Sequence, residues 1–136
     1  MSIQFHVMLR ITGELCSPEE ITERTGITPT RSWHKGELLK GTVEGKTILR
    51  YEENGWELKS GLDLESPLED HIKSVADAVS SASDVLREFT TKYDAFIECA
   101  AYFDETTPEL CLDPELVGWL ASLNLGLDID LYPLGD

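Results

Sequence analysis

The 136-residue sequence lacks the cysteine and histidine spacings that are typical of metal and redox sites. Its three cysteines, Cys16, Cys99 and Cys111, lie far apart, and no two of them form a CxxC pair. The three histidines are equally scattered and include no HxxxH pair. We therefore expect incidental or buried thiols, no catalytic cysteine, no metal site and no cofactor.

The strings that mark common nucleotide-binding and hydrolytic enzymes are also missing. The sequence contains no GxxxxGK, GxGxxG or GxSxG motif. No residue can be assigned a catalytic role on this basis. We expect a protein that is not an enzyme, and a metal-assisted hydrolase is the least favoured alternative.

Long hydrophobic runs do not occur. No stretch approaches the roughly 20 apolar residues that a membrane-spanning helix needs. The opening string, MSIQFHVMLRITGE, alternates in polarity and lacks the basic start and apolar block of a secretion signal. The length fits one domain over residues 1–136. We expect a soluble, cytoplasmic protein that does not associate with membranes.

Positive charge is scarce, because 11 lysines and arginines face 26 acidic residues and the net charge is −15. This excess argues against binding to nucleic acid or to anionic membranes. The distribution is uneven: residues 93–136 hold ten carboxylates and no lysine or arginine, whereas residues 28–50 hold five basic residues and two acids. The acidic third is either a solvated surface or a face that attracts a basic partner.

Alternation of apolar and polar residues predicts strands over residues 5–11, 93–103 and 125–132. In the last of these, the leucines and isoleucine at odd positions, Leu125, Leu127, Ile129 and Leu131, are expected to face the core. Ser17 and Asp113, each followed by a proline, predict the starts of two helices. A longer helical region begins near Ser66; Ser81 with Asp84 could cap a second helix, so the sequence leaves open whether the helix breaks or kinks near Ser80–Ser83.

Two further segments complete the predicted pattern. Residues 27–34 read as extended, and residues 36–45, with three glycines, read as a loop. Residues 46–61 predict a hairpin with Asn54 and Gly55 at its turn, since both residues tolerate positive φ.

A strand–helix–strand unit recurs at the two ends of the chain, from Phe5 to Trp33 and from Phe96 to Tyr132. The predicted hairpin and the long helix lie between the two units. One sheet with helices on a single face buries these apolar stripes most simply. The predicted fold is an α+β sandwich of the ferredoxin-like kind, with a mostly antiparallel sheet and pseudo-repeated βαβ units.

Distinctive strings are spread from Ile11 to Tyr132: ITGE, PEEIT, GITPTRSWHKGE, GWELKSGL, PLEDHI and LDIDLY. In these strings the chain resembles a family of uncharacterised bacterial proteins, the domain of unknown function 4279 family. The most distinctive positions are Pro29, Thr30, Trp33, Lys35 and Gly36, followed by Trp56, Leu58, Ser60 and Gly61. The resemblance implies a small stand-alone bacterial protein and brings no established activity or catalytic residue.

The basic stretch provides the first candidate site. In a strand, Arg31, Trp33 and Lys35 share one face and His34 lies on the other. Basic side chains beside an indole can make cation–π contacts or neutralise a phosphate or carboxylate ligand. Trp56 joins this site if its strand neighbours that of Trp33. In the alternative interpretation, both tryptophans belong to the core.

The second candidate is an acidic face formed by Glu98, Asp128 and Asp130, which are expected to point away from the core. Such carboxylates can bind a divalent cation or act as an acid–base pair, but ion pairing with Arg10 or solvation is the simpler expectation. Outward-facing Met8, Phe96, Tyr102 and Tyr132 could form a homodimer face.

Three functions remain open from the sequence. The favoured one is an interaction module, for example an immunity-like protein, that binds a basic protein partner. The alternatives are a small-anion sensor that uses Arg31, Trp33 and Lys35, and the metal-assisted hydrolase.

Overall fold

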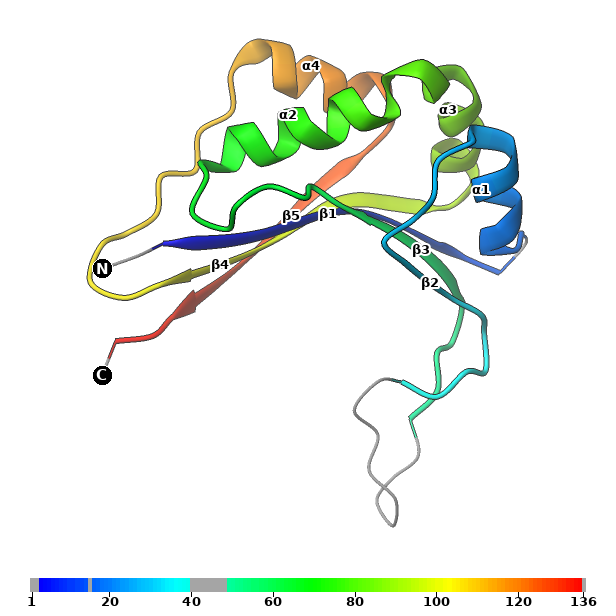
Figure 1. Cartoon of the computed structure of the whole chain (residues 1–136), viewed down its shortest axis with the longest axis horizontal. Helices are drawn as coiled ribbons and strands as arrows, with labels where there is room; N and C mark the ends of the chain where they lie inside the picture. The colour runs from blue at the N-terminus through cyan, green and yellow to red at the C-terminus, as the bar shows by residue number, and fades with distance from the viewer. Residues whose placement is uncertain (1–2, 15, 40–48, 136) are drawn as a thin grey trace.

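The structure, a computed structural model, describes residues 3–14, 16–39 and 49–135 of the chain. It is an open five-stranded sheet with its helices on one face (Figure 1). The strands are β1 (Gln4–Gly13), β2 (Arg31–Trp33), β3 (Asn54–Lys59), β4 (Asp94–Phe103) and β5 (Gly126–Pro133). The α-helices are α1 (Pro18–Thr25), α2 (Leu68–Val79), α3 (Ser83–Lys92) and α4 (Pro114–Ser122).

The sheet is mixed. Its strand order is β2-β3-β1-β4-β5, in which the pairs β2–β3, β3–β1 and β1–β4 are antiparallel and β5 runs parallel to β4. The predicted α+β class is confirmed, and the ferredoxin-like topology stays a prediction. The two predicted repeats are not equivalent in the sheet, because β3 lies between β1 and β2 whereas β4 and β5 are direct neighbours.

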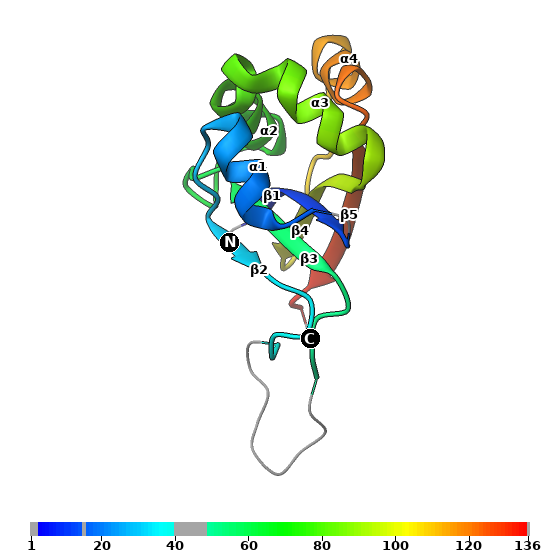
Figure 2. The same cartoon turned by 90° about the vertical axis from the view of Figure 1, so that its right-hand side faces the viewer.

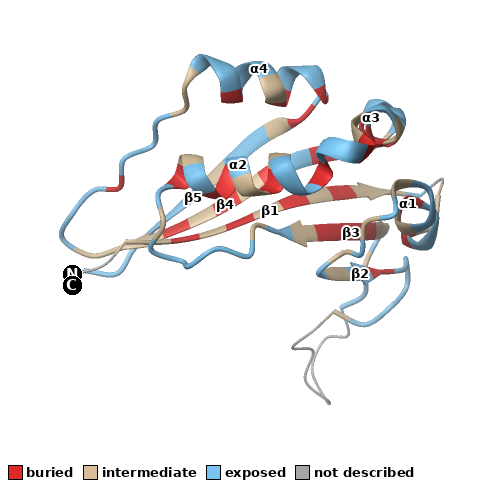
Figure 3. Cartoon of the chain, turned by 45° about the horizontal axis from the view of Figure 1, so that its top comes forward, coloured by how far each residue is buried: buried red, intermediate tan, exposed pale blue. Residues whose placement is uncertain are grey.

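The core lies between the helices and the two central strands (Figure 3). Alternate residues of β1 are buried against the helices, as its sequence pattern predicts: Phe5, Val7, Leu9 and Ile11. The stripe of α2, formed by Leu68, Ile72, Val75 and Val79, packs on them. Each fully buried side chain of this size stabilises the fold by about 1.5–3 kcal/mol.

Capping hydrogen bonds set the predicted starts of α1 and α4. The Ser17 Oγ accepts a hydrogen bond from the Glu20 N–H, and the Asp113 Oδ1 accepts one from the Leu116 N–H. Gly26 ends α1 with a φ of 75°. The break that the sequence left open is present: a 3₁₀ turn over Ser80–Ala82 separates α2 from α3, which runs in another direction (Figure 2).

The predicted turn at Asn54 and Gly55 is wrong, because both residues begin β3. A Cβ atom on Gly55 would lie 2.0 Å from the Trp33 ring, so glycine is needed here for close packing and not for a turn. The Asn54 side chain donates to the Cys16 carbonyl (2.8 Å) and accepts from the Lys35 N–H (2.7 Å). Residues 40–48, which hold most of the predicted loop and part of the predicted first hairpin strand, lie outside the described residues.

The prediction that β5 turns its odd-numbered side chains into the core is wrong for two of them. Leu125 is buried, but Leu127 is 38% exposed and Leu131 is 51% exposed. The reason is position: β5 is an edge strand, and the helical layer covers only its beginning. Alternation identifies the face of a strand but not whether anything packs on that face.

Candidate functional site

We call the face of the sheet opposite the helices the outer face. On it, two stacked aromatic rings contact two arginine side chains. Trp33 stacks on Tyr51 with ring centroids 4.6 Å apart. The Arg31 guanidinium lies 4.6 Å from the Trp33 ring, and that of Arg10 lies 5.2 Å from it. Trp33 is therefore buried although no helix covers it. Cation–π contacts of this kind contribute about 0.5–1 kcal/mol each at exposed sites.

A buried carboxylate joins the two arginines. Glu57, whose side chain is 6% exposed, lies 3.1 Å from the Arg10 Nε and 3.7 Å from the Arg31 Nε. Arg10 also donates from Nη1 to Glu98 at 3.1 Å. The cluster Arg31–Glu57–Arg10–Glu98 thus crosses four strands and has no net charge. A carboxylate buried to this extent would be costly without such partners.

Two hollows flank Arg10 on the outer face. One, of about 410 Å³, lies beside Trp33, Tyr51 and Arg50. The other, of about 450 Å³, is lined by Arg31, Lys59 and both glutamates of the cluster. Each has the size of a small-molecule site. The second has three cationic and two anionic side chains in its wall.

The residues of the predicted basic site do not all lie together in the structure. Arg31 and Trp33 share the outer face, as predicted from their spacing. Lys35 does not join them, because it lies beyond the end of β2 and its Nζ pairs with Glu14 at 2.5 Å. Trp56 lies on the opposite face, fully buried in the core, where its Nε1 donates to the Thr22 Oγ1 at 3.0 Å. Lys35 and Trp56 are therefore removed from the candidate site.

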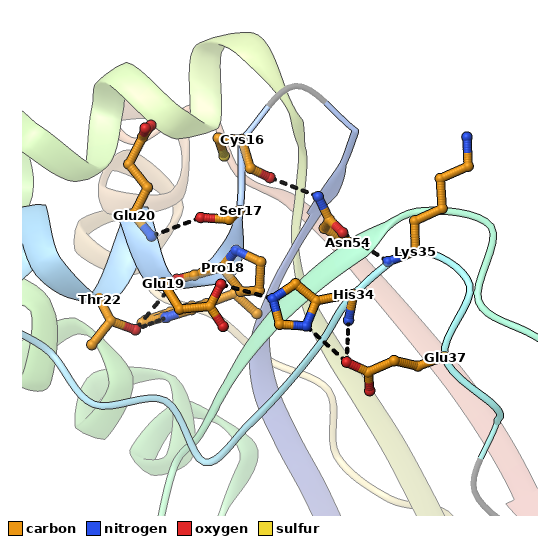
Figure 4. Close-up of polar contacts among 11 residues, drawn as sticks. Cys16, Ser17, Pro18, Glu19, Glu20, Thr22, His34, Lys35, Glu37 and Asn54 are labelled. Atoms are coloured by element: carbon orange, nitrogen blue, oxygen red, sulfur yellow. Dashed lines mark hydrogen bonds and ion pairs between the residues drawn. The ribbon is translucent and has the colours of Figure 1, made fainter.

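His34 forms a separate exposed clamp (Figure 4). Its Nε2 lies 2.7 Å from a Glu19 oxygen on α1, and its Nδ1 lies 2.7 Å from a Glu37 oxygen. Hydrogen bonds to Glu19 and then Glu37 raise the pKa of His34, since both favour the protonated ring. The same bonds lower the pKa of each carboxyl. The contact between His34 and Glu19 thus links the segment after β2 to α1.

His71 makes a buried contact with a serine. Its Nδ1 lies 2.6 Å from the Ser60 Oγ, and burial lowers the pKa of the ring. The neutral imidazole can accept the serine proton, but neither residue lines the two hollows that flank Arg10. The pair holds the turn after β3 against α2, and the Ser74 hydroxyl reinforces it by donating to the Ser60 carbonyl.

The predicted acidic residues line up across the last two strands. Glu98 pairs in register with Asp128, and Ala100 pairs with Asp130. Glu98 is occupied by Arg10, whereas Asp128 and Asp130 are exposed and have no ion-pair partner among the described residues. Within the same residues, no group of three His, Cys, Asp or Glu side chains could hold a metal ion.

Sequence reasoning missed Glu57 in the cluster and Tyr51 beside it, whereas the expected ion pair of Arg10 with the acidic face is present as Arg10–Glu98. The alternation in β3 correctly puts Glu57 on the face opposite Trp56, but it does not reveal that this side chain is buried. The partners come from strands far apart in the sequence, so no spacing motif connects them. Only the strand order brings them together.

A family model described as "Domain of unknown function (DUF4279)" matches residues 3–134 of the chain. Neither the curated proteins nor the solved structures contain a significant match. None of the helices in the described residues has both the length and the apolar content needed to cross a membrane.

Proposed function

The chain belongs to the domain of unknown function 4279 family, and on this premise we propose a non-enzymatic binding module. Its acidic C-terminal third binds a basic, extended segment of a protein partner, as an immunity-like protein would. We place this activity in the bacterial cytoplasm as part of the same proposal.

The open edge of β5 carries this proposal. In the described residues β5 pairs only with β4, so its other edge offers unpaired backbone N–H and C=O groups. Along this edge, exposed Asp128 and Asp130 alternate with exposed Leu127 and Leu131. A strand that alternates basic and apolar side chains can add to such an edge through both main-chain hydrogen bonds and charge pairs.

A synthetic peptide with alternating lysine and valine tests the proposal by fluorescence anisotropy. We expect saturable binding, and we expect the double substitution Asp128→Asn and Asp130→Asn to weaken it about tenfold, since two charge pairs are lost. The matched control is Asp70→Asn with Asp77→Asn on α2, which changes the net charge equally. Equal weakening by both pairs would show unspecific attraction and would contradict the proposal.

We propose small-anion binding as the second function. Its site is not the predicted set Arg31, Trp33 and Lys35 but the hollow of about 450 Å³ beside Arg31. The supporting observation is that Arg10, Arg31 and Lys59 line it and that Lys59 has no carboxylate partner among the described residues. Phosphate and citrate, tested by thermal shift, should stabilise the wild type and Lys35→Gln but not Lys59→Gln. Equal responses of the two variants would contradict this site.

For the fold, we propose that β1 to β4 form a ferredoxin-like unit to which β5 is added. The order β2-β3-β1-β4 with antiparallel neighbours supports this, together with α1 following β1 and the helices α2 and α3 following β3.

A further inference from the structure

One cross-strand row on the outer face is polarised in charge. Met8 pairs in register with Lys59 on β3 and with Glu98 on β4, and Glu98 pairs with Asp128 on β5. The row therefore runs from a cation through an apolar residue to two anions. With neighbouring strands about 4.8 Å apart, its ends are separated by three strand spacings, or about 14 Å.

The whole outer face follows this polarity. Arg31 and Lys59 lie on the β2–β3 side, whereas Asp128 and Asp130 lie on the β5 side. Between them Glu57, Arg10 and Glu98 are already paired with one another or with Arg31. The charges of this face without an ion-pair partner among the described residues are thus Lys59 on β3 and the two aspartates on β5, on opposite sides of the surface.

Apolar and aromatic side chains fill the rest of this face. Phe96 is 39% exposed and Tyr132 is 44% exposed, and Tyr132 stacks on Tyr102 with centroids 4.9 Å apart. Half-buried Met8 pairs in register with Glu98, and Phe96 pairs in register with Arg10 of the cluster. Methionine, aromatic residues and arginine are the types enriched in protein interfaces. The helices lie on the other side of the sheet and leave this face open (Figure 1).

We propose that the outer face is a self-complementary interface that binds a second copy of this chain. A two-fold axis parallel to the strands, between β1 and β4, places β3 of one copy over β5 of the other. Lys59 then faces Asp128 of the second copy, and the symmetry repeats this pair. Two sheets pack face to face about 10 Å apart, a distance that a lysine and an aspartate side chain span together.

Charge-swap variants test this interface by sedimentation velocity on the purified protein at about 50 μM. The wild type should sediment as a dimer. Lys59→Asp alone and Asp128→Lys alone should each weaken dimerisation about a hundredfold or more, because the symmetry creates two like-charge contacts. Mixing the two variants should restore a dimer, and so should the double variant, because every contact then pairs opposite charges.

Lys73→Asp and Asp77→Lys, which make the same charge changes on α2, are the controls and should leave the dimer intact. Circular dichroism verifies that each variant is folded. A monomeric wild type, or a mixture of the two single variants that stays monomeric, would overturn the proposal. Asp128 takes part in both the dimer and the peptide complex, so the two states compete; no peptide is added here, and a monomeric wild type therefore counts against the dimer alone.

Discussion

Replacing Gly55 by alanine tests the packing that the structure assigns to the start of β3. In an ordinary strand interior this change stabilises a protein by roughly 0.5–1 kcal/mol, because glycine loses more backbone entropy on folding. Here the new Cβ would lie 2.0 Å from Cζ2 and 2.1 Å from Cε2 of Trp33. These atoms belong to a rigid ring that also contacts Tyr51 and two guanidinium groups.

The clash therefore outweighs the entropic gain. Inserting a methyl group into a well-packed site costs about 1–3 kcal/mol, and moving this ring would also disturb its contacts with Tyr51 and the two arginines. We expect Gly55→Ala to lower the free energy of unfolding by about 1–2 kcal/mol after the entropic gain is subtracted. The control is Gly118→Ala on α4, where the added Cβ meets nothing within 4 Å and should stabilise by roughly 0.5–1 kcal/mol.

Urea unfolding, followed by circular dichroism, measures both changes. In a Trp33→Leu background the Gly55→Ala penalty should disappear, because the ring atoms that cause it are gone. A Gly55→Ala protein as stable as the wild type, or a penalty that persists without the indole ring, would refute the reasoning.

Three further predictions concern the charged and polar contacts. Contacts with two carboxylates raise the pKa of His34, so the stabilisation from these contacts is fully present below the ordinary pKa of 6.5 and is lost as pH rises through the folded value. In urea unfolding, His34→Gln should therefore lower the free energy of unfolding more at about pH 5.5 than at about pH 8.5. Glu57→Gln should cost about 2–3 kcal/mol because it leaves two arginines with an uncharged partner, whereas Glu98→Gln, at a more exposed pair, should cost less than about 1 kcal/mol in the same assay. Trp56→Phe should cost about 2–3 kcal/mol through a small cavity and the lost hydrogen bond to Thr22, and a deficit no larger than that of Thr22→Val would contradict the cavity contribution.

Features that depend on neighbouring residues could be predicted from the sequence. The caps at Ser17 and Asp113 need only a hydroxyl or carboxylate and the next three residues, so their patterns predict helix starts correctly. The burial of alternate β1 residues also follows from the pattern alone, because the core must take the apolar face.

Features that depend on which strands are neighbours in the sheet could not be predicted from the sequence. Asn54 and Gly55 suit a turn as well as a close approach to an indole, and only the pairing of β2 with β3 decides between the two. The exposure of Leu131 depends on the extent of the helical layer over an edge strand. The burial of Glu57 depends on arginines from two other strands.

The central position of β1 has a consequence for the order in which the protein acquires its structure during synthesis. β1 leaves the ribosome before β3 and β4, its two partners among the described strands, and Arg10 contacts a glutamate 88 positions later. At about 5–20 residues per second, this apolar strand waits several seconds or more for its second neighbour. Such distant pairing slows folding, since a long loop must close before the contacts repay it. The apolar face of β1 therefore stays incompletely covered until β4 has been synthesised, and exposed apolar surface of this kind is prone to aggregation.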